Sequence, residues 1–189
     1  MKINILLNND YFSDHCTFSF IYPIIKSINL IKESGVKINF VHSTKNNIFD
    51  CNILIIDSRF CGKLKKRNEF IKYLKKEKTK NHKLIFVDTA DNSGQLKIDF
   101  LSFVDIYWKG QILKNINEYM NPHYGGRLFT DFYKKRFKIK DENKQISEPV
   151  KNKDLLNKIQ ICWNMGLCDH GRYAHIKQKL YSILKLNFF

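Results

Sequence analysis

The sequence has 189 residues, a formal net charge of +15 at pH 7, and 43% hydrophobic and 14% aromatic residues. This composition can form a sizeable core, which excludes a wholly disordered chain, and a count of 8 Gly and 3 Pro excludes a collagen-like or linker-like chain. The longest apolar stretch, Phe18 to Ile31, is interrupted by Pro23, Lys26 and Asn29, so no membrane helix of about 20 residues is predicted. No signal-peptide pattern follows Met1. We therefore expect a cytoplasmic protein.

The positive charge is unevenly distributed along the chain. Residues 1–60 carry 6 basic and 5 acidic side chains, whereas residues 61–189 carry 27 and 13. Lys outnumbers Arg by 28 to 5, although Arg is the residue that base readout and bidentate phosphate contacts favour. The charge therefore predicts no specific nucleic-acid partner.

The 5 cysteines form no Cys-x-x-Cys pair, which favours reduced thiols over a zinc site or a disulfide framework.

Strand and helix patterns alternate through the first part of the chain. Short apolar segments at residues 2–7, 36–41, 52–56, 83–87 and 104–108 predict strands. Helical spacing predicts helices at residues 17–34, 63–80 and 96–102, and Gly35 stands where a helix C-cap requires a positive φ. This alternation, with strands apolar on both faces, predicts an α/β fold with an open, parallel, Rossmann-like sheet flanked by helices.

We expect residues 1–115 to form this Rossmann-like domain, with the first strand central and its carboxyl end adjacent to that of the fourth strand. Residues 116–189 are predicted to be an irregular helical and loop extension that packs back on the domain and leads toward a second domain absent from this sequence. An aromatic stripe lies at helical spacing between Leu128 and Phe137, and we expect it to pack inward rather than to stack on bases. Residues 159–163 are compatible with a short strand. The amphipathic segment from Asp169 to Leu186 predicts a terminal helix.

Polar side chains follow the predicted strands at their carboxyl ends, which is where open parallel sheets bind ligands. Each of them alone is compatible with helix capping or a turn. Together they could hydrogen-bond a polyhydroxylated ligand. The residues selected on this basis are Asn9, Asp14 and His15 after the first strand, Asp88 and Ser93 after the fourth, and Lys109 and Gln111 after the fifth.

Two loops carry further candidates. In Asp88 to Gly94, a carboxylate could act as a general base toward a hydroxyl group or bind sugar hydroxyls, and Asp91 is the candidate catalytic residue. The spacing is not Asp-x-Asp, so neither a metal nor another cofactor is predicted. The segment from Trp163 to Gly171 adds Asn164 and His170 as candidate ligand contacts. The alternative interpretation is that this segment only provides the N-cap of the following helix.

Several common enzyme motifs are missing. The loop after the first strand contains no Gly, so the Gly-x-Gly-x-x-Gly turn of dinucleotide-binding proteins is absent. The sequence also contains no Walker P-loop and no Gly-x-Ser-x-Gly elbow. These observations argue against a dehydrogenase, an NTPase and an α/β-hydrolase.

The glycine-free loop from Asn8 to His15, the segment Phe86 to Gly94, the segment Val104 to Gln111, Tyr119 and the segment from Trp163 carry a resemblance to a known family. In layout the chain resembles the N-terminal half of GT-B-type glycosyltransferases, the two-Rossmann-domain enzymes encoded in bacterial surface-polysaccharide gene clusters. The resemblance implies an acceptor-side domain for surface polysaccharide or lipopolysaccharide synthesis, with a sugar acceptor as its partner. It also implies displacement at the anomeric carbon, with a carboxylate or His side chain near the acceptor hydroxyl. Asp91 is the first candidate for this group, and Asp88 and His15 are the second candidates.

In such enzymes the C-terminal domain holds the nucleotide-sugar. A nucleotide-sugar is therefore expected as a partner only if a second domain supplies its site, and transfer activity by this chain alone stays an open question. The alternative is a non-catalytic basic module that binds an anionic membrane or nucleic acid, because residues 63–80 carry 9 basic and 2 acidic side chains. This alternative includes peripheral contact with an anionic membrane. A third class is a different small-molecule enzyme on a flavodoxin-like sheet.

Overall fold

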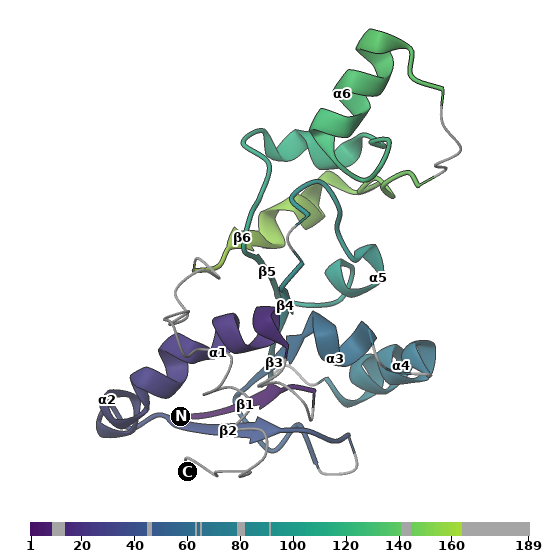
Figure 1. The fold of residues 1–189 in the computed structure, drawn as a ribbon. Coiled ribbons are helices and arrows are strands. Elements are labelled where there is room, and N and C mark those ends of the chain that lie inside the picture. The colour runs from purple at the N-terminus through teal and green to yellow at the C-terminus, as the bar shows by residue number, and fades with distance from the viewer. Residues whose placement is uncertain are drawn as a thin grey trace. The chain divides into compact units, whose positions relative to one another are not determined.

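The computed structural model describes residues 1–8, 14–44, 47–62, 64, 66–78, 82–90, 92–140 and 145–163. Its strands form one open, all-parallel, six-stranded sheet with the order β2-β1-β3-β4-β5-β6. Helices flank the sheet, so the predicted α/β class is confirmed (Figure 1). The chain divides into two compact units, and we describe each by itself. Among the described residues, one unit comprises Met1–Lys83 with Trp163, and the other comprises Leu84–Cys162.

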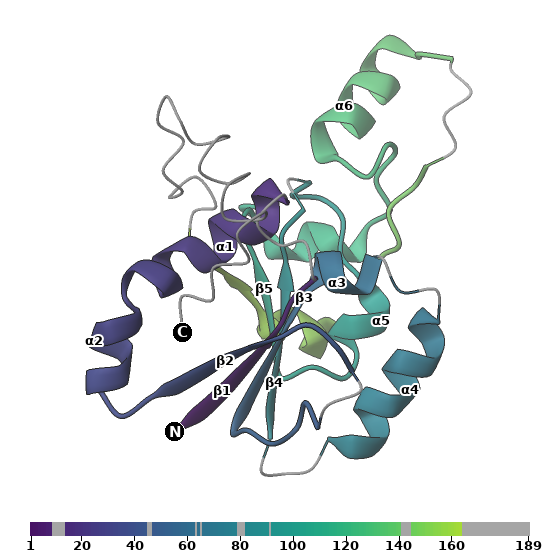
Figure 2. The ribbon, with the colours of Figure 1, turned by 60° about the horizontal axis from the view of Figure 1, so that its bottom comes forward.

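The first unit contains three of the strands. Its elements are β1 (Lys2–Leu6), α1 (His15–Lys26), α2 (Ile28–Glu33), β2 (Lys37–Val41), β3 (Ile53–Asp57), α3 (Ser58–Gly62) and α4 (Arg67–Glu77). Consecutive residues such as Ile5 and Leu6 are fully buried, because helices cover both faces of a parallel sheet. In Figure 2, α1 and α4 lie on opposite sides of β1 and β3, as right-handed crossovers in opposite directions require.

The position of β1 differs in part from the expectation. As predicted, β1 is an interior strand, with β2 on one side and β3 on the other. Its neighbour is β3 and not β4, so the predicted adjacency of the first and fourth strands is wrong. The chain passes from β1 to β2, and β3 then returns to the other side of β1. The sequence pattern of a strand does not indicate on which side of β1 it pairs, because buried strands on either side have the same apolar composition. The strand order therefore could not be inferred from the strand patterns.

The first predicted helix is also two helices. Ser27 has φ −100° and ψ 11°, which interrupts the helix between α1 and α2. The spacing of Ile24, Ile28 and Ile31 hides this break, because a one-residue interruption leaves the apolar period unchanged. Gly35 has φ 77°, which confirms its predicted positive φ after the second of these helices.

The second unit contains the other three strands. Its elements are β4 (Lys83–Asp88), α5 (Ile98–Leu101), β5 (Ile106–Lys109), the 3-10 helix η1 (Ile116–Met120), α6 (Leu128–Phe137), the 3-10 helix η2 (Lys153–Lys158) and β6 (Ile159–Ile161). Its core is aromatic. The ring of Phe86 stacks on Phe100 at a centroid distance of 4.3 Å and packs on Tyr107 at 5.3 Å.

The aromatic stripe of α6 does not pack inward. The side chains of Phe129, Phe132, Tyr133 and Phe137 are 51–62% exposed, so the predicted burial of this stripe is wrong. Every residue of α6 is described, and Asp131 is its buried residue. The helix therefore turns a polar side toward its own unit, which periodicity alone could not indicate.

Candidate functional site

The first candidate region lies at the carboxyl ends of β1 and β3. These strands are neighbours, with Leu6 opposite Ile56 in the register. Connections leave β1 and β3 in opposite directions, which makes their carboxyl ends a topological switch point, the usual ligand position in open α/β sheets.

Asp14 and His15 stand at the beginning of α1 beside this switch point. Asp14 is the N-cap, and its Oδ1 accepts hydrogen bonds from the backbone amides of Cys16 at 3.1 Å and Thr17 at 3.2 Å. The Asp14 carboxylate therefore satisfies helix amides, which is the capping role that sequence alone also allowed. His15 is the first helical residue, and it is exposed.

Asp57 and Arg59 are the charged residues that β3 brings to the same place. Asp57 is fully buried, and its carboxylate accepts hydrogen bonds from the Thr17 hydroxyl and from the Arg59 backbone amide. The Arg59 Nη2 atom donates to Cys16 Sγ at 3.0 Å. Partial burial lowers the pKa of Arg59, but Cys16, Asp14 and Asp57 outweigh this effect, so the pKa is raised and the guanidinium stays charged. Neither Asp57 nor Arg59 was among the selected site residues, although Asp57 directly follows the strand predicted at residues 52–56 and Arg59 stands two residues later.

The second candidate region lies at the carboxyl ends of β4 and β5 and is built around a buried ion pair. Lys109 Nζ lies 2.9 Å from Asp88 Oδ2, and the two residues are 0% and 1% exposed. The Tyr107 hydroxyl donates to the same oxygen at 2.7 Å, and Asp88 Oδ1 accepts the Ala90 amide. Both carboxylate oxygens are therefore hydrogen-bonded, and in this structure the pair is enclosed rather than open to a ligand.

Two tyrosines hold the loop that follows Asp88. The Tyr107 hydroxyl accepts the Lys97 amide at 2.9 Å, so it connects Asp88 to the far end of the loop. The Tyr119 hydroxyl donates to the Ser93 carbonyl at 2.6 Å and accepts the Leu113 amide at 3.1 Å. The loop is thus fixed at its beginning, at Ser93 and at its end.

A glycine contact supports the same loop from another direction. A Cβ atom at Gly94 would lie 2.8 Å from the Gly126 carbonyl oxygen and 3.2 Å from Arg127 Cα. Gly125 and Gly126 have φ 66° and 67°, which favours glycine at both positions. The turn before α6 therefore approaches the loop closely because both sides lack a side chain.

The environment of Tyr119 predicts a pH dependence. Burial, the largest cause, and the charge of Asp88 raise the pKa of Tyr119 to about 12, from 10. Between these values the unfolded chain releases the tyrosine proton and the folded chain keeps it, so this contribution to stability is complete below pH 10 and is lost as the pH rises through 12. We expect the urea midpoint of the wild type to fall more steeply across this window than that of Tyr119→Phe. Equal slopes in the two proteins would contradict the assignment.

The structure places the remaining candidates as follows. Ser93 is half-buried within the loop after β4, and Gln111 is exposed after β5. Asn9, Asp91, Asn164 and His170 lie outside the described residues, as does the whole segment 164–189 with the predicted terminal helix. Asp14 and His15 belong to one unit and the loop after β4 belongs to the other, so each group is described within its own unit.

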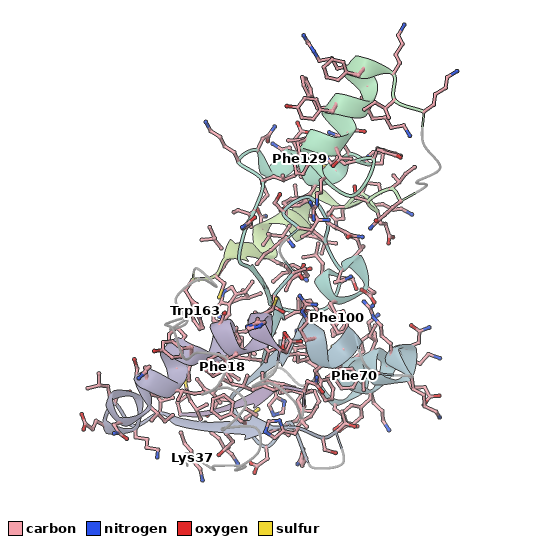
Figure 3. The ribbon with its side chains drawn as sticks, viewed as in Figure 1. Phe18, Lys37, Phe70, Phe100, Phe129 and Trp163 are labelled. Atoms are coloured by element: carbon pink, nitrogen blue, oxygen red, sulfur yellow. The ribbon has the colours of Figure 1, made fainter. Side chains whose placement is uncertain are left out.

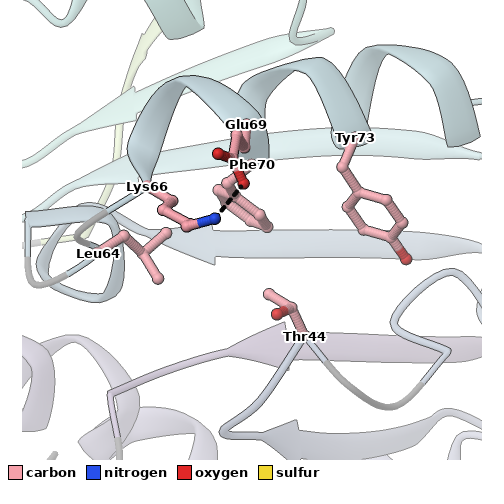
Figure 4. A pocket seen from close by; sticks show the side chains of 6 residues that line it. All are labelled: Thr44, Leu64, Lys66, Glu69, Phe70 and Tyr73. Atoms are coloured by element: carbon pink, nitrogen blue, oxygen red, sulfur yellow. Dashed lines mark ion pairs between the residues drawn. The ribbon is translucent and has the colours of Figure 1, made fainter.

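A shallow hollow elsewhere in the first unit contains none of the selected residues. Its volume is about 360 Å³, and Thr44 lies across it from side chains of the beginning of α4 (Figure 4). The Lys66 and Glu69 side chains at its rim form an ion pair at 3.2 Å, and both are largely exposed. Across the residues that the structure describes, no group of three His, Cys, Asp or Glu side chains is placed to bind a metal ion.

Comparison with protein-family models, with curated proteins and with solved structures finds no match for this chain. The α/β assignment therefore depends on the strand order and pairing alone. Within the described ranges, no helix has both the length and the apolar character that crossing a membrane requires. The 4 described cysteines, Cys16, Cys51, Cys61 and Cys162, are thiols, as expected.

Proposed function

We propose that this chain is the acceptor-side part of a nucleotide-sugar-dependent glycosyltransferase that acts in surface polysaccharide or lipopolysaccharide synthesis. The observation that supports the proposal best is the loop after β4, which the buried Asp88–Lys109 pair and the hydroxyls of Tyr107 and Tyr119 hold in place. A fixed polar loop at the carboxyl end of a parallel strand suits the binding of a sugar, whose hydroxyl groups need donors and acceptors at defined positions.

In this proposal Asp88 and Lys109 are positioning residues. Their charges are paired inside the unit, so they hold the loop and leave its later residues to meet the acceptor. Asn92 and Ser93 are half-buried in this loop, and Asn92 Oδ1 accepts the Gly94 amide. Asp91 stands between Ala90 and Asn92 in the sequence and is the proposed general base.

The proposed reaction is a displacement at the anomeric carbon. The acceptor hydroxyl oxygen forms the new bond to this carbon while its proton passes to the Asp91 carboxylate. The bond between the anomeric carbon and the diphosphate breaks, and the electron pair leaves with the nucleoside diphosphate. The donor is a partner only where a second domain provides its site, and the reaction as proposed uses no metal.

Saturation-transfer NMR on the full chain tests the acceptor role. The probes are the methyl glycosides of glucose, galactose, mannose and N-acetylglucosamine, with free UDP as a separate sample. We expect at least one glycoside to bind and UDP to bind weakly or not at all. The variant Asp91→Ala loses the proposed hydrogen bond between a glycoside hydroxyl and the charged carboxylate. Glycoside binding should therefore weaken about tenfold or more.

The matched control is Asp154→Ala, which removes an exposed carboxylate from η2 in the same unit. It should leave glycoside binding unchanged. Binding of UDP with no binding of any glycoside would contradict an acceptor-side role, as would equal losses in the two variants.

A further inference from the structure

Helix α6 exposes an apolar face that the proposed function does not use. At 100° per residue, the side chains of Leu128, Phe129, Phe132, Tyr133 and Phe137 fall within one half of the helix circumference, with Arg136 among them. All five apolar side chains are 41–62% exposed, and Figure 3 shows Phe129 on this helix.

The opposite face of α6 contacts its own unit through polar groups. Asp131 accepts the Tyr124 amide at 3.1 Å and forms an ion pair with Lys135. The Lys134 ammonium group lies 3.3 Å from the centroid of the Tyr124 ring. These contacts fix the rotation of the helix about its axis, so the outward direction of the aromatic face is a property of the fold.

Basic side chains surround the aromatic face. Residues 127–140 contain 6 basic side chains and 1 acidic side chain, and that acidic residue, Asp131, is buried and paired. The guanidinium groups of Arg127 and Arg136 lie over the rings of Phe129 and Phe137, at 5.7 Å and 5.9 Å from the centroids. The face therefore combines exposed Phe, Tyr and Leu with a border of positive charge.

We propose that this face of α6 binds the surface of an anionic phospholipid bilayer. An interfacial helix buries Phe and Leu side chains at the boundary between headgroups and acyl chains, while Lys and Arg contact lipid phosphates. A Tyr side chain within such a face suits the headgroup region. The helix lies in the plane of the surface and does not cross the bilayer.

The charge favours a lipid surface over a second copy of the chain. An isologous contact would bring the same basic side chains of two copies together, and their repulsion would oppose it. The composition of the face also favours lipid over single-stranded nucleic acid. Leu128 at one end of the face and Ile139 just beyond the end of α6 are exposed aliphatic side chains, which provide no ring on which a base could stack.

This inference is independent of the proposed transferase function, because α6 holds no residue of the proposed acceptor loop. Co-sedimentation of the full chain with vesicles tests it. The vesicles contain phosphatidylcholine alone or phosphatidylcholine mixed with phosphatidylglycerol. We expect binding to the anionic vesicles and little binding to the neutral ones.

Two pairs of variants separate α6 from the general positive charge of the chain. The double change Arg136→Glu with Lys138→Glu should reduce the vesicle partition coefficient about tenfold or more. The change Lys72→Glu with Lys76→Glu alters the net charge equally on exposed positions of α4 and should have a much smaller effect. Similarly, Phe132→Ser should reduce binding, whereas Leu30→Ser on α2, where Leu30 is 69% exposed, should not.

Equal losses in both members of either pair would overturn the proposal, since binding would then follow overall charge or hydrophobicity. Failure of the wild type to bind anionic vesicles would also overturn it. So would a wild-type dimer in sedimentation velocity that Phe132→Ser converts to a monomer, because the face would then be a contact between copies. Binding of oligo(dT) that Phe132→Ser abolishes, without vesicle binding, would assign the face to nucleic acid instead.

Discussion

Replacement of Lys109 by Met is expected to lower the free energy of unfolding by about 3–5 kcal/mol. The ammonium group of Lys109 lies 2.9 Å from Asp88 Oδ2, and neither residue is accessible to solvent. Without Lys109 the Asp88 carboxylate would stay buried with hydrogen bonds from Tyr107 and Ala90 but without a counter-charge. Urea unfolding of the full chain at neutral pH, followed by circular dichroism, measures the loss.

Two further variants identify the cause of this loss. The double variant Asp88→Asn with Lys109→Met removes both charges, so it should be less destabilised than the sum of the two single variants. Lys66→Met removes one partner of the exposed Lys66–Glu69 pair and should change stability by no more than about 0.5–1 kcal/mol. If Lys109→Met were as mild as Lys66→Met, the buried pair would not hold the loop as we infer.

The strands of this fold were predictable because burial on both faces leaves a strong pattern in the sequence. Segments such as Leu84 to Val87 are continuously apolar, and such segments occur in sheets covered by helices on both sides. All five predicted strands are present with shifts of one or two residues at their ends, and the short segment beginning at Ile159 is a sixth strand. The strand order was not predictable in the same way, because it depends on which edge each crossover reaches.

The aromatic stripe of α6 shows a different limit of periodicity. Spacing indicates that Phe129, Phe132 and Phe137 share one side of a helix, but it does not indicate whether that side faces the core. Here the deciding contacts are made by Asp131 and Lys134 with Tyr124, which lies seven and ten residues before them. Such polar contacts between a helix and the turn that precedes it have no apolar signature in the sequence.

The sequence could not separate the candidate residues at strand ends by role, as two described examples show. Asp14 caps α1, whereas Asp88 joins an ion pair with a residue 21 positions later. Both are Asp residues after a predicted strand, so composition gives them equal weight as ligand contacts. Only the partners and the burial, which depend on packing between distant segments, distinguish a cap from a buried ion pair.

Replacement of Gly94 by Ala is expected to destabilise the protein by about 1–3 kcal/mol and to move the loop after β4. The added Cβ would lie 2.8 Å from the Gly126 carbonyl oxygen, and this backbone atom belongs to a turn that two positive-φ glycines define. Neither side can yield by rotating a side chain, so the loop or the turn must shift. Urea unfolding and the NMR shifts of the loop amides measure both effects.

Gly62→Ala is the control, because no atom lies within 4 Å of its Cβ position at the end of α3. The control should be neutral or slightly stabilising, by at most about 1 kcal/mol. Equal stability of the two variants, with unchanged loop shifts in Gly94→Ala, would mean that this close approach does not position the loop.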